Sequence, residues 1–122
     1  MMKQIKFVGV PTRDQERALT FWTKQVGMTV VTDQPMGPGM RWIELALPGA
    51  ATGIALFTPP GHEGRIGSFT SISFGCDDVE ATYRELSERG VKFAQPPKKE
   101  GWGTSALFED SEGNSFVLGS MQ

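Results

Sequence analysis

The chain contains one supersecondary pattern twice. An extended segment leads into a helix, a glycine and several short strands, and the same order begins again near Ser68. Four pairs of residues share an offset of 64 positions: Asp14 and Asp78, Glu16 and Glu80, Leu19 and Tyr83, and Trp22 and Leu86. A repeat of that length indicates two copies of one unit. The repeat therefore restricts the chain to folds that are built from two similar modules.

The size of the chain favours a single domain. At 122 residues it can bury one core but not two independent ones. We expect module 1 at about 1–58, a linker at 59–67 and module 2 at about 68–122. The formal net charge of -2 gives no reason to expect nucleic acid or an anionic membrane as a partner. With no long apolar run, and with Cys76 as the single cysteine, the sequence favours a cytoplasmic location.

In module 1 the helix carries the clearest signals. Asp14 suits the N-cap, an apolar stripe that includes Trp22 follows at helical spacing, and Gly27 suits the end of the helix. The strands that we expect around this helix are Gln4–Val10, Met28–Thr32, Trp42–Leu47 and Gly53–Thr58, with a loop at Asp33–Met40.

Module 2 repeats that order. Asp77 or Asp78 caps its helix, Glu80 after Asp77 resembles a capping box, and Gly90 ends the helix. The strands expected here are Ser68–Gly75, Val91–Ala94, Thr104–Glu109 and Ser115–Gly119, with a loop at Gln95–Gly103.

The alternation of side chains along the strands predicts two faces for each sheet. The residues expected to face the helices are Ile54, Leu56, Ile72, Phe74, Phe116 and Leu118. Those expected on the opposite, concave face are Phe7, Gly9, Trp42, Glu44, Gly53, Ala55, Phe57, Ser71, Ser73, Ala106, Phe108 and Val117. That second set is aromatic and small with few charges, as in the wall of a pocket.

Three stretches then carry a family resemblance across nearly the whole chain. They are Asp14–Trp22 running to Met28, Asp77–Tyr83 running to Val91, and Trp102-Gly103 followed by Phe108–Asn114. With them the chain resembles the vicinal oxygen chelate superfamily, which includes glyoxalases, extradiol dioxygenases, fosfomycin-resistance enzymes and bleomycin-resistance proteins. The resemblance implies an α+β fold of two tandem βαβββ modules that form a cupped, open barrel, and it implies a homodimer.

The same resemblance implies where a metal ion would be held. In the family's metalloenzymes a His, Gln or Glu lies on the first strand of each module, and a carboxylate lies on the last. Carried across, these positions are Phe7, Ala55, Ser71 and Val117, and none has a side chain that ligates a metal as His, Cys or carboxylate does. We therefore expect no metal ligands and no cofactor.

The function predicted from these features is that of a metal-independent small-molecule-binding protein, similar to the bleomycin-resistance branch. An apolar, aromatic pocket suits an aromatic or cationic ligand. The residues predicted to bind it are Phe7, Met40, Trp42, Glu44, Phe57, Ser71, Ser73, Trp102 and Phe108. The loop Met36–Met40, which contains two methionines, two glycines and a proline, would serve as a lid.

Alternatives remain open at this stage. Glu44 in an apolar cleft could be the base of a glyoxalase-like lyase or isomerase, or it could pair with Arg41 or Arg65 in solvent. His62 could be a general base, although a solvated loop residue is the favoured interpretation. A third possibility is an interaction module in which the tryptophans only pack.

Overall fold

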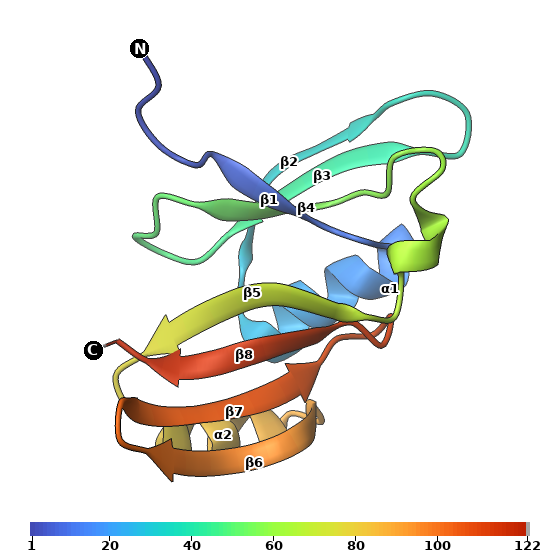
Figure 1. The fold of residues 1–122 in the computed structure, drawn as a ribbon. Helices are drawn as coiled ribbons and strands as arrows, with labels where there is room; N and C mark the ends of the chain where they lie inside the picture. Colours follow the sequence, from blue (N-terminus) through green and yellow to red (C-terminus); the bar gives the residue numbers. More distant parts are fainter. Residues whose placement is uncertain (122) are drawn as a thin grey trace. The chain divides into compact units, whose positions relative to one another are not determined.

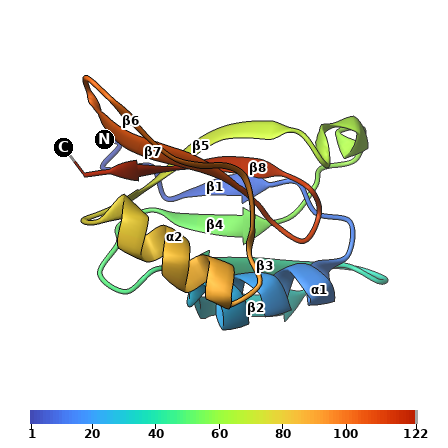
Figure 2. The same cartoon turned by 90° about the horizontal axis from the view of Figure 1, so that it is seen from below.

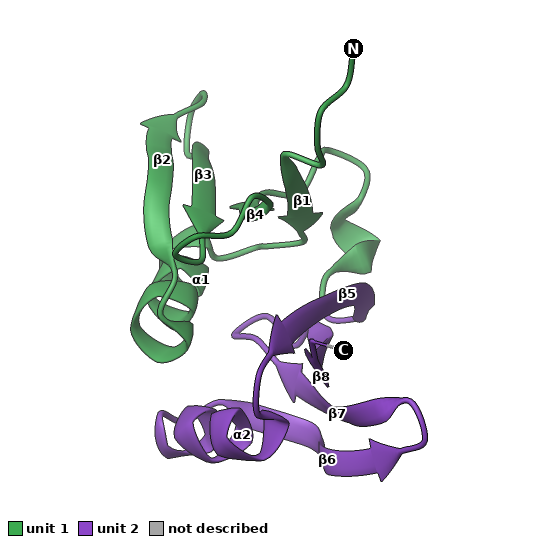
Figure 3. Cartoon of the chain, turned by 90° about the vertical axis from the view of Figure 1, so that its left-hand side faces the viewer, with its two compact units in different colours: residues 1–66 green, residues 67–122 purple. Residues whose placement is uncertain are grey.

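The computed structural model describes residues 1–121, which form two compact units that meet in the sequence at Ile66 and Gly67 (Figure 3). Each unit contains a four-stranded sheet and helical segments in the order βαβββ. The predicted α+β class and the two tandem modules are confirmed.

In unit 1 the helix follows β1 in the sequence and precedes β2 (Figure 1). Its sheet has the order β1-β4-β3-β2, with β1 parallel to β4 and the other pairs antiparallel. Helix α1 packs against β4. The elements are β1 (Phe7–Val10), α1 (Gln15–Thr20), η1 (Phe21–Val26), β2 (Thr29–Pro35), β3 (Arg41–Ala46), β4 (Gly53–Leu56) and the 3-10 turn η2 (Glu63–Arg65).

The helix of unit 1 begins and ends where the sequence predicts. The carboxylate of Asp14 accepts a hydrogen bond from the backbone N–H of Arg17 at 3.0 Å, and Gly27 takes a left-handed φ of 97°. Its second half, Phe21–Val26, winds as a π-helix, which sequence spacing does not predict. Trp22 is fully buried, as the apolar stripe requires.

The side chain of Gln15 joins helix α1 to two strands. Its Nε2 donates to the backbone oxygens of Arg41 at 2.7 Å and Leu56 at 2.8 Å, and its Oε1 accepts from the N–H of Arg41 at 3.1 Å. Strands β3 and β4 pair through Glu44 with Ala55 and through Leu45 with Ile54. Toward the start of β3, the Gln15 amide forms the link between these two strands.

Unit 2 repeats the arrangement with a helix that is α-helical throughout (Figures 1 and 2). Its sheet has the order β5-β8-β7-β6, with β5 parallel to β8, and helix α2 packs against β6, β7 and β8. The elements are β5 (Phe69–Cys76), α2 (Val79–Glu88), β6 (Lys92–Glu100), β7 (Gly103–Glu109) and β8 (Ser115–Ser120).

Of the two N-cap candidates for α2, the structure selects Asp78, whose carboxylate accepts from the N–H of Ala81 at 3.0 Å. One prediction for unit 2 is wrong: strand β6 continues through Pro96 and Pro97, where the sequence indicates a loop. A strand at the edge of a sheet is bonded on one side only, so it accommodates prolines that a central strand would not.

The prediction that the Phe108 side chain lies on the concave face of the sheet is wrong. Phe108 is 2% exposed, stacks on Phe116 with ring centroids 5.2 Å apart, and lies 5.9 Å from Phe74. Its strand partner is Phe116, and paired residues point to the same face of a sheet. Phe108 therefore belongs to the core beneath α2, and so does Ala106, the partner of Leu118.

The turn between β7 and β8 is held by a buried polar cluster. The Asp110 carboxylate accepts from the backbone N–H groups of Glu112 and Asn114 and from the Asn114 side chain, each at 2.9 Å. The Asn114 side-chain oxygen in turn accepts from the N–H of Gly67 at 2.8 Å. Burial raises the pKa of Asp110 above its ordinary value, although these hydrogen bonds oppose the rise.

Within residues 1–121, none of the helices has both the length and the apolar character of a membrane-spanning segment.

Candidate functional site

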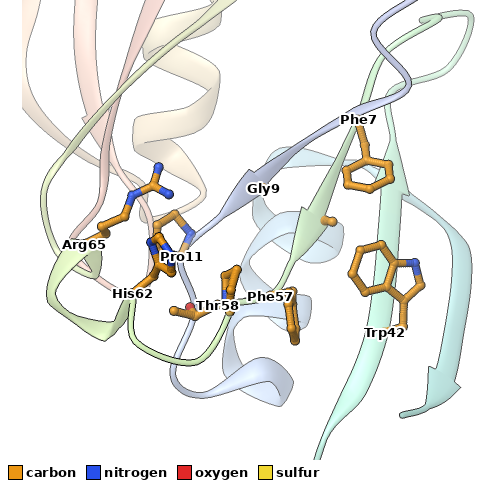
Figure 4. A pocket seen from close by; sticks show the side chains of 10 residues that line it. Phe7, Gly9, Pro11, Trp42, Phe57, Thr58, His62 and Arg65 are labelled. Atoms are coloured by element: carbon orange, nitrogen blue, oxygen red, sulfur yellow. The ribbon is translucent and has the colours of Figure 1, made fainter.

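Unit 1 contains a pocket with a volume of about 330 Å³ (Figure 4). This volume is at the small end of the range for small-molecule sites. The pocket is lined by Phe7, Gly9, Pro11, Trp42, Ala55, Phe57, Thr58, Pro59, His62 and Arg65.

Three aromatic side chains form one end of this pocket. Trp42 contacts Phe7 edge-on, with ring centroids 5.3 Å apart, and contacts Phe57 in a tilted arrangement at 5.5 Å. They come together because β1, β4 and β3 are adjacent in the sheet and present alternate side chains to this face, and Phe57 follows directly after β4. Gly9 and Ala55, a strand pair, form a floor of small residues beside them. The predicted placement of Phe7, Trp42 and Phe57 on one face is confirmed.

Glu44 supports the aromatic end without lining the pocket. Its Oε1 accepts a hydrogen bond from the indole Nε1 of Trp42 at 2.9 Å, two residues along the same strand. This bond fixes the orientation of a ring that is only partly buried. The carboxylate of Glu44 thus positions Trp42. Arg41, one of the ion-pair partners suggested for Glu44, instead pairs with Glu16 and Asp33.

Arg41 fastens the strand next to Trp42. Its guanidinium contacts Glu16 on α1 at 2.7 Å and Asp33 on β2 at 2.6 Å. Hydrogen bonding to Asp33 raises the pKa of Arg41, and the reciprocal bond lowers the pKa of the Asp33 carboxyl. Because the ion pair is partly exposed, its main consequence is geometric: it links β3, β2 and α1.

The opposite end of the pocket is polar and comes from the segment after β4. The hydroxyl of Thr58 holds the backbone of Thr12: it accepts from the N–H of Thr12 at 2.7 Å and donates to the Thr12 carbonyl at 3.0 Å. His62 and Arg65 lie beside Pro11 at this end (Figure 4). Both side chains are exposed, and the N–H of Arg65 donates to the His62 carbonyl at 3.0 Å, which keeps them on one turn.

The sequence alone does not indicate the polar end of the pocket. It favours a solvated loop residue at His62, and it suggests for Arg65 only an ion pair with Glu44. The one signal in the sequence was Pro59-Pro60-Gly61, because such a segment turns the chain. The structure shows the turn, with the N–H of His62 bonded to the Pro59 carbonyl at 3.0 Å.

Met40 lies at the base of the tight hairpin between β2 and β3 and is not among the lining residues. The hairpin loop is shorter than the sequence indicated, because β2 extends to Pro35, which pairs with Arg41. A lid role for this segment stays a prediction.

The remaining predicted site residues belong to unit 2. Ser71 has a positive φ of 63° within an irregular stretch of β5, and Ser73 pairs with Val117 on β8. Trp102 is 68% exposed at the turn between β6 and β7. Their roles in ligand binding stay predictions, whereas Phe108 is removed from the site by its place in the core.

The residues at the four positions that the family resemblance implies for metal ligands do not fit a metal ion. Phe7 and Ala55 in unit 1, and Ser71 and Val117 in unit 2, offer two hydrocarbon side chains, one methyl group and one neutral hydroxyl. Among residues 1–121, His, Cys, Asp and Glu side chains do not gather in any group of three that could hold an ion.

The sequence profile of the Glyoxalase/Bleomycin resistance protein/Dioxygenase superfamily matches residues 4–118. The chain belongs to this superfamily. The relative YetH from Bacillus subtilis (strain 168), described as uncharacterized, is 39% identical over 118 residues, covering 97% of this chain and 98% of YetH.

Solved structures in this superfamily have the same fold. One member from Sphaerobacter thermophilus DSM 20745 superposes with a TM-score of 0.88 at 34% identity, covering 98% of each chain. TnmS3 from Streptomyces sp. CB03234, an antibiotic-binding protein, superposes with a TM-score of 0.84 at 34% identity, covering 98% of this chain and 96% of TnmS3.

Proposed function

We propose that this superfamily member is a small-molecule-binding protein that holds an aromatic ligand in the unit 1 pocket without a metal ion. The observation that carries the proposal is the aromatic end of the pocket, where Trp42, Phe7 and Phe57 surround a floor of small residues. Aromatic rings offer a flat molecule large contact area at little conformational cost. The similarity to TnmS3, an antibiotic-binding protein, supports binding as the activity.

We propose a function without a metal ion because the side chains at the relevant positions are not metal ligands. A catalytic divalent cation needs about three protein ligands, and Phe7, Ala55, Ser71 and Val117 supply none of the usual kinds. The carboxylate of Glu44, the alternative catalytic base, accepts the indole N–H of Trp42, and Glu44 is not among the residues that line the pocket. Binding without turnover is therefore the simplest function for this set of side chains.

The test is a titration with 1-N-phenylnaphthylamine, a neutral aromatic probe whose fluorescence rises in apolar sites. We expect saturable binding at one probe per chain, unchanged after dialysis against EDTA.

Native mass spectrometry of the freshly purified protein would report any co-purified organic ligand and the number of subunits, which we propose to be two. Absence of saturable binding would contradict the binding function. A stoichiometric rise in Tm with nickel, zinc or manganese would contradict the metal-free part.

A further inference from the structure

The two ends of the unit 1 pocket differ in chemistry. The aromatic end is formed by Phe7, Trp42 and Phe57, while the other end carries the guanidinium of Arg65 and the imidazole of His62 (Figure 4). No Asp or Glu is among the ten lining residues. The pocket therefore offers a ligand positive charge and N–H donors at one end only.

The nearby carboxylates of unit 1 have other contacts. Glu44 accepts the indole N–H of Trp42, and Glu63, which lies between His62 and Arg65 in sequence, accepts from the backbone N–H of Gly61 at 3.0 Å. Neither lines the pocket. A cationic ligand, one of the two classes that the sequence suggested, would thus meet a guanidinium and no carboxylate among the lining side chains.

We propose that the ligand is an aromatic acid: a flat ring system with a carboxylate or phenolate substituent. Its ring would lie against Trp42 and Phe57, and its anionic oxygen would accept hydrogen bonds from Arg65 and His62. A guanidinium has five N–H donors in a planar fork, so Arg65 can bind an anionic oxygen in addition to its contacts within the protein. This inference rests on the proposed function, and it names the ligand class for the same pocket.

Both ends are held in position by contacts that a ligand does not need to make. The aromatic end is fixed by the bond from Trp42 to Glu44, and the segment leading to the polar end is fixed by the paired bonds between Thr58 and Thr12. The aromatic wall and the start of the segment that carries the polar end are therefore positioned before binding, which lowers the entropic cost of recognising a molecule with both features.

The experiment compares three probes of nearly equal shape by isothermal titration calorimetry: 2-naphthoate, 2-naphthamide and 2-naphthylmethylammonium. We expect the acid to bind about tenfold more tightly than the amide, because a charge-assisted hydrogen bond at a partly exposed site contributes modestly. The amine should bind more weakly than the amide. Raising the salt concentration should weaken binding of the acid and leave the amide unchanged.

The variant Arg65→Gln should bring the acid to the affinity of the amide without changing the amide. Arg17→Gln, which removes the same charge from an exposed position on α1 outside the pocket lining, should leave the preference intact. Equal affinity for all three probes, or a preference that survives Arg65→Gln, would overturn the aromatic-acid assignment but not the binding function. Failure of every probe, including 1-N-phenylnaphthylamine, would overturn both.

Discussion

Replacing Trp42 by alanine should weaken ligand binding by about 2 kcal/mol, or roughly thirtyfold in Kd. Trp42 is the residue that touches both Phe7 and Phe57, so its removal takes away the ring that joins the two sides of the aromatic end. The affinity of 2-naphthoate and 1-N-phenylnaphthylamine should fall together, since the loss is of ring contact and not of charge. Calorimetry of the variant measures the effect.

Three companion variants make this result specific. Trp42→Phe keeps an aromatic ring and should retain most of the affinity. Glu44→Gln keeps an oxygen that can accept the indole N–H and should bind like the unmodified protein, whereas Glu44→Ala frees the ring and should bind more weakly. Circular dichroism would show that each variant is folded. Undiminished affinity in Trp42→Ala would place the binding site outside this pocket.

The second large effect concerns stability. Asn114→Ala should lower the free energy of unfolding by about 3 kcal/mol, because it removes the acceptor of the Gly67 N–H and a donor to the Asp110 carboxylate at a fully buried position. The corresponding fall in Tm is on the order of 10 °C. Urea unfolding followed by circular dichroism measures the loss. Gln34→Ala, an exposed amide on β2, is the matched control and should change stability by less than about 0.5 kcal/mol.

The Asp110 carboxyl at the centre of that turn should also make stability depend on pH. Its pKa is raised in the folded protein, so the folded state binds the proton more tightly than the unfolded chain does. Its contribution to stability is therefore fully present below the ordinary pKa of 3.8 and is lost as the pH rises through the higher folded value. The difference in unfolding free energy between the unmodified protein and Asp110→Asn isolates this term, and it should decrease with rising pH over that window. A difference that grows with pH would contradict the raised pKa.

The aromatic end of the pocket was predictable because strand periodicity is strict. Trp42 and Glu44 on one strand, and Phe57 shortly after the next, obey the alternation that a single buried face imposes. The same reasoning failed for Phe108, because the face of a strand also depends on its register with its neighbour. The Asp110–Asn114 turn sets that register and pairs Phe108 with Phe116.

The polar end could not be predicted in the same way. His62 and Arg65 lie on an irregular segment that has no periodicity, and only the three-dimensional course of the chain brings them to the pocket. Strand β6 shows a related limit. Pro96 and Pro97 indicate a loop when taken alone, and only the place of β6 at the edge of its sheet makes them compatible with a strand.

The link made by Gln15 places a chemical requirement on one position of the sequence. Its side-chain amide acts as a substitute peptide group inserted between β3 and β4, donating twice and accepting once. Glutamate has the necessary length but lacks the donors, and asparagine has the donors but is one methylene shorter. Either substitution at Gln15 would therefore break part of the link between β3 and β4 in this chain.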